Sequence, residues 1–305
     1  MENIGIFYNG LLTVILLVLV GIFLGWRKIF PVNISKVVSN LLLMVAMPAA
    51  LFNSFPNVFD ADLLFLFIKA VLFAVLVMTA AVLVARLLFS KRRLKEHFRE
   101  HQFAFIFNNA SFIGYPLVSA TFGVTGLIPY AGLMSVFSFF LFTYGVHIFE
   151  KKLTWRSIAQ ALLNPNIIAV SLGLIFFLFS ISLPEFATTT IKHLANLTTP
   201  LSLLLIGALL SQADWKQLLT KKRLFVTCAL QLLLVPTLVY LLLYIFNAPL
   251  IIRQVFVLIQ ALPTATSLAL FAEKYNGNAM EASELVFIST VMSVVTLPVV
   301  AYFLL

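Results

Sequence analysis

Two polar stretches interrupt long apolar runs of the sequence, and their residue types suit the binding of a small anion. The first, "IFNNASFIGYP" (106–116), contains Asn108, Asn109, Ser111, Tyr115 and Pro116. The second, "LIQALPTATSLALF" (258–271), contains Gln260, Pro263, Thr264, Thr266 and Ser267. Proline ends the regular hydrogen bonding of a helix, and a helix that restarts after such a break offers N–H groups to an anion. Amide side chains add neutral donors and acceptors, so these ten residues are the predicted substrate-binding residues.

Other kinds of chemistry lack a comparable signal. All 11 acidic residues map to loops or to the ends of apolar runs, and Cys228 is the sole cysteine. The sequence shows no cluster of histidine, cysteine and carboxylates with metal-ligand spacing, no phosphate-binding glycine loop and no nucleophile beside a base. His97 and His101 are assigned to the basic loop before the fourth apolar run, as interfacial histidines rather than proton relays. No catalytic residue, metal or cofactor is therefore predicted, and the protein is not expected to be an enzyme.

Composition identifies the elements that must position the two stretches. The chain has 305 residues, of which 62% are hydrophobic and 10% charged, and its mean hydropathy is +1.08. Apolar runs of about 20 residues, each sufficient to span a lipid bilayer, recur along the whole chain. The formal net charge of +9 comes from bases in short loops beside these runs, which argues against nucleic acid as a partner and for membrane lipid. The sequence thus predicts an all-α, polytopic membrane protein.

Hydropathy predicts ten transmembrane helices, at residues 6–26, 35–55, 63–89, 102–122, 127–149, 158–180, 187–210, 224–246, 251–273 and 283–304. Cytoplasmic loops carry an excess of lysine and arginine. With both termini outside, all of the 20 basic residues except Lys69, Lys192 and Arg253 lie toward the inner side. This arrangement predicts a multi-pass protein of the cell membrane with its N-terminus and C-terminus outside. Lys69 either reaches outward to the interface or neutralises an anion, and the sequence favours the first.

The polar breaks also indicate an internal repeat. The break in the fourth span has a counterpart in the ninth, and "SKVVSNLL" (35–42) in the second span is echoed by "IKHLANLT" (191–198) in the seventh. Both pairs are offset by five helices. An odd number of spans per unit reverses the membrane orientation of the second unit, so residues 1–149 and 158–305 are predicted to form a 5+5 inverted repeat. Transporters built this way bind substrate near the membrane midplane, at broken helices in corresponding positions of the two halves.

Several stretches resemble the auxin efflux carrier family, in particular its bacterial members described as malate- or malonate-permease-like. The most specific is "ALPTATSLALFAEKYNGNAMEASELVFISTVMSVVTLP" (261–298), and "NNASFIGYPLVSATFGVTGL" (108–127), "NPNIIAVSLGL" (164–174) and "TTPLSLLLIGALL" (198–210) are also similar. The resemblance implies a fold related to bile-acid symporters and sodium–proton antiporters, in which broken helices 4 and 9 cross. Spans 1, 2, 6 and 7 would form a scaffold that dimerises, and spans 3–5 and 8–10 a transport domain that moves against it. A long hydrophilic loop found in many plant members is replaced here by "EKKLTWRSIA" (150–159), which favours a small bacterial carboxylate over auxin itself.

These observations predict a secondary transporter of small organic anions, such as malate, malonate or auxin-like acids, in the bacterial inner membrane. It would work by alternating access at the crossing of the fourth and ninth spans. Two alternatives stay open: a sodium-coupled symporter similar to the bile-acid carriers, and a membrane receptor that binds the anion without transporting it. The direction of transport, its coupling to protons or sodium, and the choice between Asn108 and Asn109 as the contact residue are also open.

Overall fold

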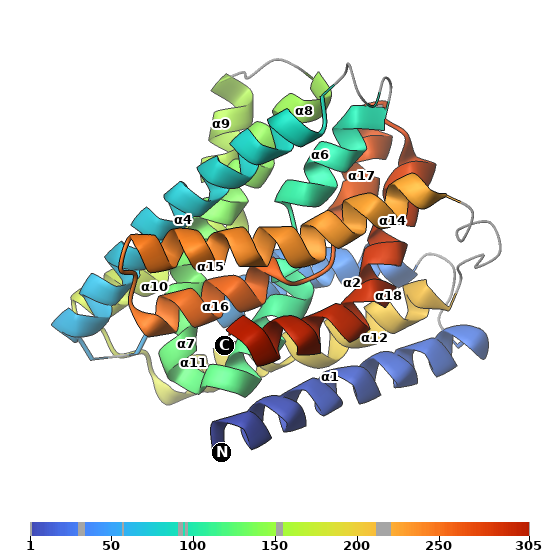
Figure 1. Ribbon diagram of the computed structural model, residues 1–305. Coiled ribbons are helices and arrows are strands. Elements are labelled where there is room, and N and C mark those ends of the chain that lie inside the picture. The colour runs from blue at the N-terminus through green and yellow to red at the C-terminus, as the bar shows by residue number, and fades with distance from the viewer. Residues whose placement is uncertain are drawn as a thin grey trace. The chain divides into compact units, whose positions relative to one another are not determined.

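The computed structural model describes residues 2–29, 34–56, 58–90, 94, 97–150, 155–211 and 221–304, and these residues are nearly all helical (Figure 1). Basic residues on which the predicted orientation partly depends lie outside the described residues, namely Lys91, Arg92, Arg93, Lys95, Lys151, Lys152 and Lys216. Helices dominate because a chain in lipid must satisfy its backbone N–H and C=O groups internally.

Helical segments follow one another along the chain with short connections. In the N-terminal half they are α1 (Glu2–Trp26), α2 (Ile34–Leu41), η1 (Leu42–Ala46), α3 (Met47–Phe52), α4 (Ala61–Leu88), α6 (Phe98–Ile106), η3 (Ala110–Gly114), α7 (Tyr115–Phe140), η4 (Leu141–Gly145) and α8 (Val146–Glu150). In the C-terminal half they are α9 (Trp155–Leu162), α10 (Pro165–Leu178), α11 (Glu185–Asn196), α12 (Thr198–Leu210), α14 (Lys222–Ala229), η5 (Leu230–Leu234), α15 (Val235–Ile245), α16 (Leu250–Gln260), α17 (Ser267–Lys274) and α18 (Ala279–Leu304). Segments labelled η are π-helical turns.

Five helices of the described chain are long and apolar enough to cross a membrane: Ala61–Leu88, Thr125–Glu150, Glu185–Leu210, Lys222–Ile245 and Ala279–Phe303. Shorter apolar helices are Ile15–Trp26, Val37–Phe52, Pro165–Leu178 and Leu250–Gln260. The molecule is therefore built as a helical multi-pass membrane protein. The ten spans and the inverted repeat stay predictions.

Proline explains three of the π-helical turns in the described chain. Pro48, Pro116 and Pro236 are each the second residue of the helix that follows a π-turn, in α3, α7 and α15 respectively. Proline cannot donate to the carbonyl four residues earlier and its ring clashes with that carbonyl, so the preceding turn widens. For Pro116 the carbonyl that loses its donor belongs to Phe112, and the Ser202 hydroxyl donates to it at 2.7 Å. Ser202 thus restores the hydrogen bond that the proline removes.

Gly123 divides α7 into two helical pieces. Its backbone angles are φ 57° and ψ −147°, a region that is accessible almost only to glycine. The predicted connection between the fourth and fifth spans, at residues 122–127, falls at this position.

Residue contacts divide the chain into two compact units. Unit 1 comprises Met1–Ile68, Ser111–Ser135 and Leu163–Ala213, and unit 2 comprises Lys69–Ala110, Val136–Leu162 and Asp214–Leu305. Each unit draws on both halves of the sequence. The repeat boundaries at residues 149 and 158, and the division into scaffold and transport domain, stay predictions.

In unit 1, α1 packs lengthwise against α12 through glycines (Figure 1). A Cβ atom on Gly207 would lie 2.1 Å from the Val18 carbonyl oxygen, and one on Gly21 would lie 2.3 Å from that of Leu204. Backbones approach this closely only where side chains are absent, which is a common way for helices to pack in membranes.

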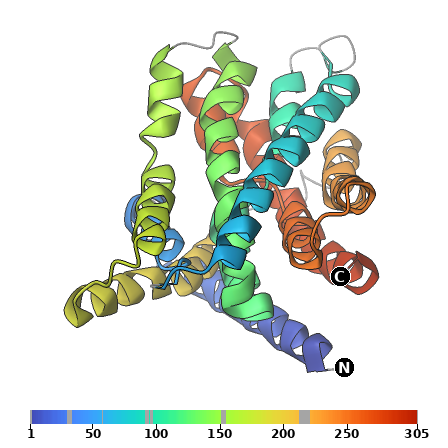
Figure 2. The same ribbon diagram turned by 90° about the vertical axis from the view of Figure 1, so that its left-hand side faces the viewer.

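In unit 2, α15 and α16 lie side by side and α18 packs against both, as Figure 2 shows in orange and red. α6 packs against α14, α17 and α18. The ends of α6 and α16 lead into the two polar breaks, so unit 2 holds the point where the two breaks meet.

Candidate functional site

The two polar breaks pair with each other in unit 2. Asn108 and Thr264 form an isolated antiparallel bridge. The Asn109 amide donates to the Pro263 carbonyl at 2.6 Å, and the Ala265 amide donates to the Phe107 carbonyl at 2.9 Å. Backbone that leaves a helix inside a membrane protein must find other partners, and here each break supplies them for the other. We call residues 107–109 and 263–265 the paired break.

An amide pair lies beside the paired break and is only partly satisfied. The side chain of Asn108 donates through Nδ2 to Oε1 of Gln260 at 2.8 Å, and these residues are 2% and 1% exposed. Oδ1 of Asn108 and Nε2 of Gln260 are buried without a hydrogen-bond partner. Exchanging the oxygen and nitrogen positions of both side-chain amides would reverse this hydrogen bond. In either arrangement the pair keeps one acceptor and one donor unused. Buried polar groups are rarely left unpaired in folded proteins, so this pair is suited to a polar ligand or to water.

Helical structure restarts directly after each break. η3 begins at Ala110 and α17 begins at Ser267. Asn109 is 3% exposed, whereas Thr266 and Ser267 at the start of α17 are partly exposed. The N-terminus of a helix carries partial positive charge, so the start of α17 favours a negatively charged group.

The remaining predicted site residues, Ser111, Tyr115 and Pro116, belong to unit 1. Tyr115 is 8% exposed and its ring centroid lies 6.0 Å from that of Tyr130. Pro116 shapes the backbone through η3. Within unit 1 Tyr115 and Pro116 therefore pack or bend the segment, and the residues that the structure brings together at the paired break are Asn108, Asn109, Gln260, Pro263 and Thr264.

Two residues that the sequence analysis did not select support the paired break. Ser289 of α18 accepts through Oγ from the Thr264 amide at 3.0 Å, and Gln231 of η5 donates through Nε2 to the Leu262 carbonyl at 2.5 Å. Both are fully buried, at 0% and 1% exposure. The sequence feature that could have identified each of them is a single polar residue inside an apolar run. Gln231 also stands five residues before Pro236, as Ser111 stands five residues before Pro116.

Replacement of Gln231 with leucine is expected to lower the free energy of unfolding by about 1–3 kcal/mol, because the Leu262 carbonyl loses its buried donor and becomes an unpaired buried polar group. The midpoint of thermal unfolding of the purified protein measures this effect. The matched control is Thr237→Val in neighbouring α15, where an exposed hydroxyl bonds only to its own helix. Equal midpoints in the leucine and valine variants would show that Gln231 does not support the break.

The prediction for His101 was wrong in its placement. His101 is not in a loop: it lies inside α6 and is 0% exposed. Three carboxylates assigned to loops or span ends, Glu100, Glu281 and Glu284, are also buried, at 1%, 4% and 8% exposure. A hydropathy scale treats ionisable side chains as exposed, so it places them outside buried helices. In the folded chain their partners, described below, offset the free-energy cost of burying them.

Comparison with known proteins tests whether the chain is a membrane transport protein. A family model described as "Membrane transport protein" matches residues 6–159 and 150–301. The chain belongs to this family. The resemblance to the auxin efflux carrier family is thereby confirmed. An uncharacterized transporter of Methanocaldococcus jannaschii is 29% identical over 210 residues, which cover 66% of this chain and 68% of that protein. Membership of this family and the apolar helices together show a multi-pass membrane protein of a transport family.

Proposed function

We propose that the protein is a secondary carrier of small organic anions, and that the paired break is its substrate site. The supporting observation is the buried amide pair of Asn108 and Gln260, whose open acceptor and donor adjoin two helix starts. A carboxylate accepts hydrogen bonds from N–H groups; the open donor of the amide pair supplies one, and the start of α17 adds partial positive charge. Small carboxylates such as malate, malonate or auxin-like acids fit this chemistry, and no step of it requires catalysis.

The carrier would work by alternating access, with the paired break as the crossing of the predicted fourth and ninth spans. In the proposed orientation both termini are outside the bacterial inner membrane, and a scaffold of spans 1, 2, 6 and 7 forms a homodimer. Moving one elementary charge across the membrane changes the free energy by about 2.3 kcal/mol per 100 mV. At an inside-negative potential, anion export therefore needs no coupled ion, whereas accumulation does.

Flux of radiolabelled malate, malonate and indole-acetate in proteoliposomes tests the proposal. We expect saturable flux and counterflow of at least one of these acids, with a rate that follows an imposed potential. Empty liposomes and protein heated before reconstitution serve as controls. Binding without counterflow would contradict the proposal and support the receptor alternative, and flux that requires sodium would support the sodium-coupled symporter.

A further inference from the structure

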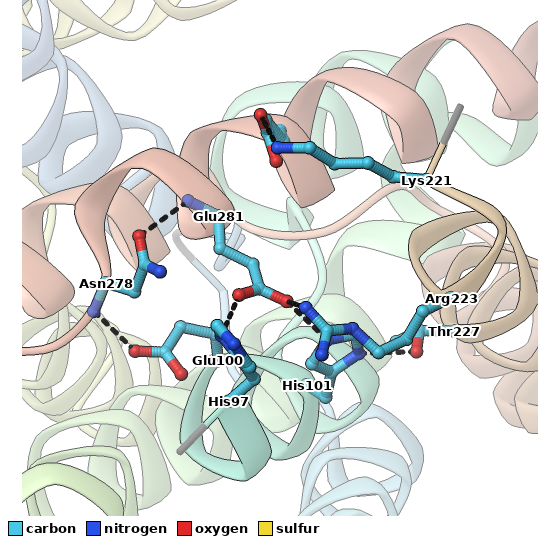
Figure 3. Close-up of polar contacts among 9 residues, drawn as sticks. His97, Glu100, His101, Lys221, Arg223, Thr227, Asn278 and Glu281 are labelled. Atoms are coloured by element: carbon cyan, nitrogen blue, oxygen red, sulfur yellow. Dashed lines mark hydrogen bonds and ion pairs between the residues drawn. The ribbon is translucent and has the colours of Figure 1, made fainter. Parts of the chain in front are cut away.

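Nine polar or charged side chains gather in unit 2 where α6, α14 and α18 begin (Figure 3). We call them the Glu281 cluster: His97, Glu100, His101, Lys221, Arg223, Thr227, Asn278, Glu281 and Glu284. The cluster is distinct from the paired break and takes no part in the proposed substrate site.

The Glu281 carboxylate is the common partner of three basic groups. His97 Nδ1 contacts its Oε2, while His101 Nε2 lies 2.9 Å and Arg223 Nη2 lies 2.5 Å from its Oε1 (Figure 3). The start of α18 does not use the Glu281 carboxylate for its own capping, so the three basic groups can bind it. Asn278 caps α18 by accepting the Glu281 amide at 3.1 Å. A glutamate three residues after a capping residue, as Glu281 is after Asn278, often accepts a hydrogen bond from the backbone amide of that residue. Here the Asn278 amide already donates to Glu100 at 2.7 Å, so the Glu281 carboxylate is not needed for this contact.

His101 can hold or release a proton without losing a hydrogen bond. Its ring lies between Glu281 and the Thr227 hydroxyl, which is 2.5 Å from Nδ1. In the neutral ring Nε2–H donates to Glu281 and Nδ1 accepts from Thr227. In the protonated ring Nδ1–H donates to the same hydroxyl, because a hydroxyl can either donate or accept. The buried His101 ring therefore has a hydrogen-bond partner in place for either protonation state.

His97 connects this buried ring to water. Its side chain is 33% exposed and contacts the same carboxylate as His101. It lines a cavity of about 150 Å³ together with Lys221, Arg223 and Glu281. A proton can therefore reach the Glu281 carboxylate and the His101 ring from the aqueous phase through His97.

The other ionisable side chains around Glu281 are either paired with an opposite charge or buried in a way that favours the neutral form. Lys221 pairs with Glu284 at 2.5 Å. Burial raises the pKa of Glu100, which favours its neutral form. Among the described residues no three histidine, cysteine or acidic side chains are arranged to hold a metal ion, and the Arg223 guanidinium already occupies the carboxylate that such an ion would need. The remaining exchangeable ligand is a proton.

The cluster is joined to the paired break by the start of α18. Glu281 and Ser289, whose Oγ accepts from the Thr264 amide, are eight residues apart within this helix. A rise of 1.5 Å per residue makes their separation about 12 Å along the helix axis. On the other side of the cluster, His101 lies in α6, which ends at Ile106, two residues before Asn108.

We propose that His97, His101 and Glu281 form a proton-binding site that controls anion binding at the paired break. This inference rests on the proposed transport function. A proton from water is taken up by the imidazoles with Glu281 as counter-ion, the net charge of the site rises by one, and the proton leaves through the same opening. An added unit charge about 12 Å from an anion, at an effective dielectric constant of about 20, strengthens anion binding roughly tenfold.

The test measures the concentration of labelled substrate at half-maximal flux between about pH 8 and about pH 5.5, the range in which imidazole titrates. In the wild type this concentration is expected to fall about tenfold as the pH is lowered, by the electrostatic argument above. The double variant H97Q/H101Q is expected to remove the response, and exposed His193→Gln, in unit 1, to retain it. Glu100→Gln is expected to keep most of the response, because Glu100 is not the proton acceptor.

Proton uptake itself is measured on the detergent-solubilised protein by NMR with labelled histidine, of which the chain has four. The signals lost in His97→Gln and His101→Gln are expected to shift as the pH is lowered, because the proposed proton binds to these rings. If they do not titrate, or if the double variant keeps the full pH response of flux, the site does not exist. If no acid is transported by any variant, the proposed function fails, while the NMR titration still decides whether the protons bind.

Discussion

Replacement of Asn108 with aspartate is expected to abolish the proposed transport of organic anions, with a loss of roughly a thousandfold near neutral pH. Aspartate has nearly the shape of asparagine, so the backbone pairing of Asn108 with Thr264 can persist. Its negative charge would lie about 4 Å from a bound carboxylate, which costs about 4 kcal/mol at an effective dielectric constant near 20. Flux per folded molecule in proteoliposomes, at several substrate concentrations, measures the loss.

Two further variants separate charge from fold. Asn247→Asp adds the same charge at an exposed position between α15 and α16 and should leave flux within about twofold, because exposed charges are well screened. Lower pH should restore part of the activity of Asn108→Asp, because a buried carboxyl tends to take up a proton. A folded Asn108→Asp protein with wild-type flux would remove Asn108 from the substrate site and leave Asn109, tested as Asn109→Ala, as the contact residue.

Replacement of Gly207 with valine is expected to disrupt unit 1 and to cause the largest loss of stability. Its Cβ would lie 2.1 Å from the Val18 carbonyl and 2.7 Å from the Ile22 amide nitrogen, both backbone atoms of α1. No rotamer change relieves a backbone clash, so α1 and α12 must separate along their shared length. Overpacking typically costs about 1–3 kcal/mol, and we expect the upper end, about 3 kcal/mol.

Loss of helical circular dichroism on heating provides the measurement, because this signal reports on the helices of both units. The melting temperature of the valine variant should fall by about 6 °C or more, since 1 kcal/mol corresponds to about 2–4 °C in chains of 150–250 residues. Leu19→Val on α1, at a position that is 53% exposed, should leave the melting temperature almost unchanged. A Gly207→Val protein as stable as this control would contradict the close packing of α1 and α12.

Several features of the molecule can be predicted from the sequence. The membrane class follows from apolar runs that no soluble core could bury, and the family follows from stretches that extend over most of the chain. The position of the second break follows from Pro263, because proline acts on the local backbone in any tertiary context. The first break is marked by the polar pair Asn108 and Asn109, whereas Pro116 accounts for the π-helical turn η3 that follows it. The choice of Asn108, Gln260 and Thr264 as site candidates followed from polar residues beside those breaks.

What the tertiary structure alone decided is which distant residues meet. Asn108 and Gln260 are 152 residues apart, and His101 and Glu281 are 180 apart. The family resemblance implies that the fourth and ninth spans cross, but the contacts of individual side chains depend on how α6, α16, η5 and α18 pack, and sequence spacing does not reveal these contacts. Hydropathy placed His101 in a loop because it counts an ionisable side chain as exposed. The folded chain instead buries it between a hydroxyl and a carboxylate, since partners replace the hydrogen bonds that water would have made.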